Sequence, residues 1–135
     1  MAFINWNTTL SVGIAAMDAQ HQRLIELINH LADTMMQGKG QAVIGDTLRN
    51  LVDYTRTHFG DEEKLMQTND YLESSTHRIE HDKLTKQVLD FQDQFQAGKI
   101  AVSIELMSFL KNWLTGHIQT HDKRYGTFLN QKGIR

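Results

Sequence analysis

Five histidines and two carboxylates of this chain fall where a helical bundle would keep apolar side chains. One helix face reads, in steps of three or four residues, Met17, His21, Leu24, Ile28 and Leu31. Such steps place every member of a series on the same face, which is the face that becomes buried. Burying ionisable groups is costly unless a partner pairs with them, so a shared metal is the obvious partner. The candidate metal ligands are His21, His58, Glu62, His77, His81, His117 and Asp122.

The donor types narrow the choice of metal. Imidazole together with carboxylate suits iron, zinc, copper or nickel, and disfavours calcium and magnesium. Seven ligands exceed the number that one tetrahedral zinc uses, whereas two metals that share bridging carboxylates accommodate them. The chain contains no Cys, which excludes thiolate zinc sites and cysteine-ligated iron–sulfur clusters.

The elements that must position these residues are helices. The chain has no Pro, and its apolar residues recur with helical spacing throughout, which predicts an all-α fold. Gly38-Lys39-Gly40 and Ala97-Gly98-Lys99 are typical of helix ends. Short connections favour a single domain, residues 1–135, folded as an antiparallel up-down-up-down four-helix bundle. The expected elements are a non-helical arm over 1–17, which packs along the bundle through Phe3, Ile4 and Trp6, and helices near 18–37, 41–66, 72–97 and 101–129.

Counting from the turns places the candidate ligands at one height. His21 lies about 18 residues before the turn near residue 39 and His58 about 19 residues after it, a mismatch of ~1.5 Å along antiparallel helices. His81 and His117 lie about 17 and 19 residues from the turn near residue 98. The remaining three candidates lie roughly one turn further toward the same end of the bundle. This convergence makes a joint site a better interpretation than separate buried imidazoles.

Helical spacing leaves one ligand of the last helix open. His121 is only ~40° from His117 around an ideal helix, whereas Asp122 is ~140° away. Geometry on its own therefore favours His121, while a second bridging carboxylate requires Asp122. His30 is nine residues after His21, about half a revolution away, and is expected to face solvent.

Four stretches of the sequence carry a family resemblance. They are Ser11-Val12-Gly13 with Met17-Asp18-Ala19-Gln20-His21-Gln22-Arg23-Leu24, then His58-Phe59-Gly60-Asp61-Glu62-Glu63, then His77-Arg78-Ile79-Glu80-His81, and Trp113-Leu114-Thr115-Gly116-His117-Ile118-Gln119-Thr120-His121-Asp122. Together they resemble the bacteriohemerythrins, members of the hemerythrin family of oxygen-binding non-haem di-iron proteins. The family's second connection often carries Gly-Tyr-Pro, where this chain has Asp70-Tyr71-Leu72.

The resemblance implies a role for each candidate ligand. One iron would take His77, His81 and His117, and the other would take His21 and His58 and keep an open position. Glu62 and Asp122 would bridge the two irons together with a solvent-derived oxo or hydroxo group, so the family's His-x-x-x-x-Asp spacing selects Asp122 over His121. Dioxygen would bind at the open position.

We therefore expect reversible dioxygen binding, for carriage, storage or delivery, and no enzymatic activity. This site would have only two anionic donors, whereas ferritin-like di-iron sites have four Glu and two His. Fewer anionic donors should make high oxidation states of iron less accessible. Leu24, Trp113, Leu114 and Ile118 are the expected apolar walls that exclude water from the ligand pocket. The alternatives are a di-iron oxidoreductase acting on peroxide or nitric oxide, and an oxygen-sensing module.

Bulk properties exclude several other classes of protein. The chain has 135 residues and a formal net charge of -2, without the basic surface that nucleic-acid binding needs. It shows no secretory signal and no apolar run near the roughly 20 residues that span a bilayer. We expect a cytoplasmic monomer whose recipient of oxygen is unknown.

Overall fold

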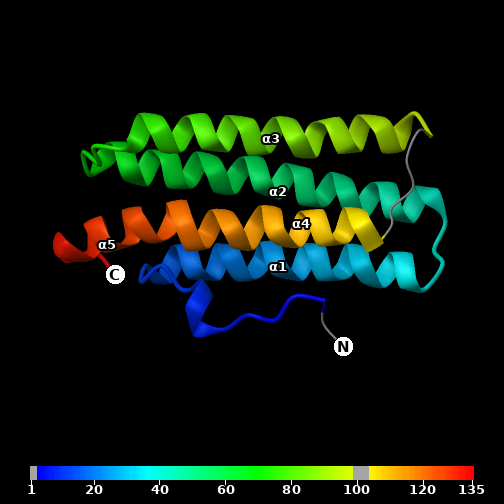
Figure 1. Ribbon diagram of the computed structural model, residues 1–135, viewed down its shortest axis with the longest axis horizontal. Helices are drawn as coiled ribbons and strands as arrows, with labels where there is room; N and C mark the ends of the chain where they lie inside the picture. The colour runs from blue at the N-terminus through cyan, green and yellow to red at the C-terminus, as the bar shows by residue number, and fades with distance from the viewer. Residues whose placement is uncertain (1–2, 99–103) are drawn as a thin grey trace.

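The chain folds as a bundle of long helices. A computed structural model describes residues 3–98 and 104–135. In chain order its elements are η1 (Thr8–Leu10), α1 (Ala15–Met36), α2 (Gln41–Thr68), α3 (Ser74–Gln96), α4 (Ile104–His117), η2 (Ile118–Asp122) and α5 (Lys123–Gln131). Figure 1 shows the long helices side by side, with consecutive helices running in opposite directions. The expected all-α, antiparallel four-helix bundle is confirmed, and none of the described helices is long and apolar enough to cross a membrane.

Several helix ends differ from the predicted ranges. α1 begins at Ala15 rather than near residue 18, which shortens the arm, because Ala15 and Ala16 are strong helix formers. The arm is also not wholly non-helical, since η1 is a short 3-10 helix within it. α3 begins at Ser74 rather than near 72, after a turn in which Asp70 adopts a φ of 57°.

The fourth predicted helix, 101–129, is not one regular α-helix. It consists of α4, the π-helical segment η2 and α5, which continues to Gln131. Its predicted start near residue 101 lies outside the described residues. The π-helical segment falls between His117 and Lys123, and it changes which side chains of this helix face the bundle interior.

Glycines end two of the long helices where the sequence predicts. Gly38 has a φ of 67° and Gly98 a φ of 71°, a left-handed conformation that costs glycine little. After α1, the Lys39 N–H donates to the Thr34 carbonyl at 3.0 Å, which satisfies a carbonyl that the helix itself leaves free. The C-terminal ends of α1 and α3 lie at the same end of the bundle, and the α2–α3 turn lies at the opposite end (Figure 1).

The arm lies against the bundle, as expected from its apolar residues. Ile4 is buried, and Phe3 and Trp6 pack partly buried against the core. Asn29 of α1 accepts from the Ile4 N–H at 2.7 Å and donates to the Ile4 carbonyl at 2.9 Å. Further along, Asp18 accepts from the Val12 N–H at 2.8 Å. The arm is therefore held at two points along α1.

Candidate metal centre

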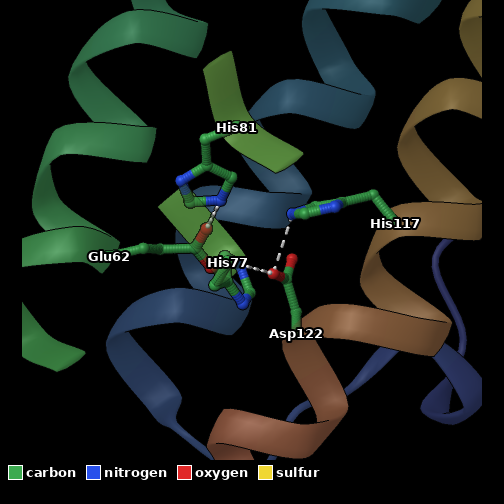
Figure 2. Close-up of side chains that lie close together, drawn as sticks. All are labelled: Glu62, His77, His81, His117 and Asp122. Carbon is green, nitrogen blue, oxygen red and sulfur yellow. Dashed lines mark ion pairs between the residues drawn. The ribbon is translucent and has the colours of Figure 1, made fainter. Parts of the chain in front are cut away.

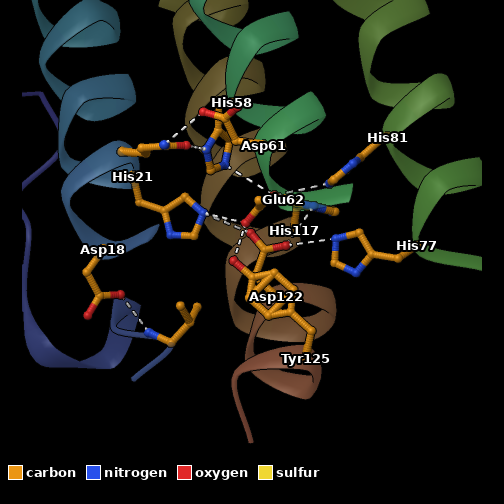
Figure 3. Close-up of polar contacts among 12 residues, drawn as sticks. Asp18, His21, His58, Asp61, Glu62, His77, His81, His117, Asp122 and Tyr125 are labelled. Atoms are coloured by element: carbon orange, nitrogen blue, oxygen red, sulfur yellow. Dashed lines mark hydrogen bonds and ion pairs between the residues drawn. The ribbon is translucent and has the colours of Figure 1, made fainter. Parts of the chain in front are cut away.

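All seven candidate ligands converge in the bundle interior, near the end that carries the α2–α3 turn. Five of the side chains are drawn in Figure 2, and Figure 3 adds the two from α1 and α2 that complete the set. None of the seven is more than 5 % exposed. They come from α1, α2, α3, α4 and η2, so the site depends on the whole bundle. The residues brought together are His21, His58, Glu62, His77, His81, His117 and Asp122.

Glu62 lies between histidines of three helices. Its Oε2 atom is 3.2 Å from His21 Nε2, and its Oε1 atom is 3.2 Å from the Nε2 atoms of both His58 and His81. One carboxylate therefore contacts α1, α3 and its own helix. Its side chain is fully buried.

Asp122 makes the matching set of contacts from the other side. Its Oδ2 atom is 3.1 Å from His21 Nε2, and its Oδ1 atom is 3.0 Å from the Nε2 atoms of His77 and His117. Figure 3 shows the two carboxylates between the imidazoles of α1 and those of α3 and α4.

The donor atoms form two overlapping groups. Glu62, His77, His81, His117 and Asp122 lie with their ligand atoms within 4.8 Å of one another, and so do His21, His58, Glu62 and Asp122. The two carboxylates belong to both groups, whereas each imidazole belongs to one. This arrangement is compatible with two adjacent metal positions that share the carboxylates, with three imidazoles at one position and two at the other.

Orphaned polar atoms indicate that these residues fit a metal. The Nε2 atoms of His77, His81 and His117 are buried without a hydrogen-bond partner among the described residues, and so are both Asp122 oxygens and Glu62 Oε1. They lie only 3.0–3.2 Å from one another, yet not in hydrogen-bond geometry. Buried polar atoms are normally paired. Lone pairs that converge at this spacing suit cis ligands of one first-row metal ion.

The electrostatics of the group keep its carboxylates ionised. Burial favours the neutral acid, but the nearby imidazoles, His58 first, hold the pKa of Glu62 well below its usual range. Burial and the charge of Glu62 both raise the pKa of Asp122, but His117 and His21 outweigh them and hold it well below its usual range. Burial lowers the pKa of His21, but the carboxylates of Asp122 and Glu62 outweigh it and raise that pKa to about 10.

The π-helical segment explains why Asp122 faces the site. In η2 the Lys123 N–H donates to the Ile118 carbonyl, five residues back, so a turn holds more residues than an α-helical turn does. His117 and Asp122, five residues apart, therefore share one face. The ideal-helix geometry that favoured His121 does not apply here.

His121 lies at the edge of the centre instead. Its side chain is 31 % exposed, and its ring stacks on that of His117 with 5.4 Å between centroids. Burial, followed by the charge of His117, lowers the pKa of His121. His30, as expected, is exposed on α1.

Two polar side chains that sequence reasoning missed orient the imidazoles. Gln20 Oε1 accepts from His58 Nδ1 at 2.6 Å, and Gln20 Nε2 donates to Asp61 at 3.1 Å. Glu63 accepts from His81 Nδ1 at 3.2 Å. An imidazole that donates from Nδ1 keeps a lone pair on Nε2, the atom that faces the carboxylates. Each of these two residues is next to a candidate ligand in sequence, but neither lies on an apolar seam.

The sequence analysis also did not predict that Tyr125 and Phe59 contact the candidate ligands. The hydroxyl of Tyr125 donates to Glu62 Oε2, and its ring stacks on His77 with 5.5 Å between centroids. Phe59 stacks on His81 at 3.9 Å. Tyr125 follows Asp122 by three residues, so helical spacing is the signal that could have identified it.

The predicted apolar wall residues are all buried. Leu24 and Ile118 are fully enclosed, and Trp113 and Leu114 are nearly so. Trp113 donates its indole N–H to the Leu84 carbonyl at 3.2 Å, and its ring lies 6.3 Å from that of Phe59, which in turn stacks on His81. Trp113 is therefore connected to the candidate ligands through Phe59, and the pocket role of Leu24, Leu114 and Ile118 stays a prediction.

Comparison with known proteins agrees with this geometry. The family model of the hemerythrin HHE cation binding domain matches residues 12–129. The bacteriohemerythrin of Pseudomonas aeruginosa (strain LESB58) is 41% identical over 125 residues, which cover 93% of this chain and 80% of that protein. The bacteriohemerythrin of Methylococcus capsulatus is 35% identical over 131 residues, covering 96% of this chain and 99% of that protein.

Solved structures show the same fold. The crystal structure of a wild-type hemerythrin superimposes with a TM-score of 0.87 at 35% sequence identity, covering 93% of this chain and 97% of that one. The matched residues contain all seven converging side chains, and this chain belongs to the hemerythrin family.

Proposed function

We propose that this protein binds dioxygen reversibly at a non-haem di-iron centre. The observation that carries the proposal is the pair of donor groups that share Glu62 and Asp122 but have unequal numbers of imidazoles. His77, His81 and His117 would hold one iron, His21 and His58 would hold the other, and the two carboxylates would bridge them. The relatives named bacteriohemerythrin support this assignment.

The unequal donor groups suggest where a ligand binds. When bound, the two iron ions would supply electrons and an open coordination position for dioxygen, with an oxo or hydroxo bridge between them. The group with two imidazoles has one protein donor fewer, so the open position belongs beside His21 and His58. Gln20 fixes the ring of His58 and thereby the shape of that position.

The surrounding residues favour binding over turnover. Five neutral imidazoles and two carboxylates give the irons little negative charge to stabilise high oxidation states. Leu24, Trp113, Leu114 and Ile118 keep water and its protons away from the pocket. Tyr125 holds the proton nearest to Glu62, and burial keeps the pKa of its hydroxyl well above the usual range. We therefore propose an oxygen carrier, store or donor rather than an enzyme.

Metal analysis and oxygen titration test the proposal. The purified protein should contain two irons per chain. After anaerobic reduction, air should produce a coloured adduct that bleaches when oxygen is removed and re-forms over repeated cycles. Oxidation that is complete after one exposure, with consumption of added peroxide or nitric oxide, would favour the oxidoreductase alternative. Protein free of iron would contradict both.

A further inference from the structure

A second pair of metal-binding side chains lies at the edge of the centre. His121 Nε2 of η2 faces Glu80 Oε1 of α3 at 4.0 Å, and the two side chains are 31 % and 27 % exposed. This distance is too long for a hydrogen bond. One first-row metal ion with bonds of about 2.0–2.2 Å holds neighbouring nitrogen and oxygen ligands roughly 3–3.5 Å apart. These two partly exposed side chains would therefore need to close by less than about 1 Å to hold one cation.

This pair is continuous with the buried centre. Ligand atoms of Glu80, His121 and His117 lie within 4.8 Å of one another. His117 directs Nε2 toward Asp122, while its Nδ1 atom is buried without a hydrogen-bond partner in the part of the chain that the structure describes. The rings of His117 and His121 are stacked. One imidazole therefore belongs both to the buried centre and to the partly exposed pair.

A small pocket opens beside one member of the pair, His121. It has a volume of about 10 Å³, room for one water-sized species, and His77 of the buried centre also lines it, whereas Glu80 does not. Arg124 at its rim lies 4.0 Å from Glu73, so its charge has an acidic partner. The pocket therefore lies between His121 and one of the three imidazoles at the larger donor group.

We propose that Glu80 and His121 form a transient uptake site for Fe²⁺, which passes the ion to the position of His77, His81 and His117. The transfer is a ligand exchange: the ion leaves one carboxylate and one imidazole for the buried donors and sheds water, with no change in oxidation state. This inference rests on the proposed di-iron function.

Timed loading of metal-free protein tests it. Fe²⁺ is added anaerobically at limiting concentration, and a fast chromogenic chelator is added at intervals to measure the iron that has become protected. Glu80→Gln and His121→Asn should each slow loading by about tenfold. The final stoichiometry should remain two irons per chain. The double variant should be no slower than the slower single variant, because both residues act on the same ion.

Matched controls separate this role from general effects. Glu26→Gln removes a carboxylate on α1 that is 65 % exposed, against 27 % for Glu80, and His30→Asn removes an exposed imidazole on the same helix. Both variants should load at the wild-type rate. Wild-type loading rates in Glu80→Gln and His121→Asn would overturn the uptake site, as would equal slowing in the controls. A wild-type end point below two irons would instead refute the di-iron function. The two variants lie on different helices, so loss of folding in one leaves the other as the test.

Discussion

Asp122 is the residue on which the proposed two-metal arrangement depends most. It contacts histidines of α1, α3 and α4, and no other carboxylate among the described residues joins Glu62 in both donor groups. Its neighbour His121 has the better position on an ideal helix but lies at the edge of the site. Ligand roles can therefore be tested by comparing these adjacent residues.

Asp122→Ala should abolish two-iron loading, because it removes one bridge and leaves His77 and His117 without their carboxylate. His121→Ala should keep the final stoichiometry of two irons per chain. Metal analysis after complete reconstitution measures both. The opposite result would assign the ligand to His121 and contradict the arrangement built on η2.

Tyr125→Phe should weaken iron binding by about tenfold while keeping two sites, because the hydroxyl that orients Glu62 is lost but the ring remains on His77. Titration against a competing chelator measures the change. Tyr71→Phe is the control, since its hydroxyl binds Glu73 rather than the centre. Equal affinities in the two variants would remove Tyr125 from the site.

Leu114→Ala should leave iron bound but speed autoxidation several-fold, because the shortened side chain admits water to the pocket. Leu31→Ala is the matched truncation, buried on α1 about 15 Å along the helix from His21. Each should cost about 2–5 kcal/mol of stability. Only the first should change the decay rate of the oxygenated spectrum, and equal rates would contradict the pocket role of Leu114.

At the scale of elements, η2 orients a candidate ligand and α5 packs against the arm. The π-helical turn directs Asp122 inward, and α5 then packs against the arm at Gly126. A Cβ atom at this glycine would lie 1.9 Å from the Val12 carbonyl oxygen. The close approach connects the arm to the helix that carries Tyr125.

Gly126→Ala should therefore destabilise the protein by about 1–3 kcal/mol, because the arm or α5 must move. Gly60→Ala, at an exposed position inside α2 with no atom within 4 Å of the added Cβ, should instead stabilise it by about 0.5–1 kcal/mol. Urea unfolding of both iron-loaded variants measures the difference. A neutral Gly126→Ala would show that the arm is loosely held.

At the scale of the whole molecule, the proposed metal centre would couple the bundle together. Five elements contribute candidate ligands, so metal binding would draw them together. Without metal, the same groups pair by protonation, with the pKa of His21 raised to about 10, that of His117 raised through Asp122 against its burial, and those of the two carboxylates lowered.

These pKa shifts predict how the stability of the metal-free protein depends on pH. The carboxylates have lowered pKa values, so their contribution is complete above about pH 4–5 and is lost as pH falls toward the folded values. The histidines have raised pKa values, so their contribution is complete below about pH 6 and is lost as pH rises from there toward 10. The urea midpoint should peak near pH 5–6 and fall by pH 9. The iron-loaded protein should lack this alkaline decline, and a metal-free midpoint that rises from pH 6 to 9 would contradict the electrostatic pairing.

Most of the architecture follows from local patterns in the chain. Apolar spacing of three and four residues, the absence of Pro and glycines such as Gly38 and Gly98 define the long helices and their turns. Because an α-helix has a fixed rise, counting from those turns also predicts that the candidate ligands share one height.

The finer placement of the site depends on packing between helices. Ideal helical spacing turns Asp122 away from His117, and only the π-helical turn brings both to one face. Tyr125, Gln20 and Glu63 acquire their roles through contacts with residues 18 to 63 positions away in sequence. Periodicity describes a single regular helix, whereas a π turn and its long-range partners form where contacts between helices offset the cost of the irregular backbone. That balance exists only in the folded protein.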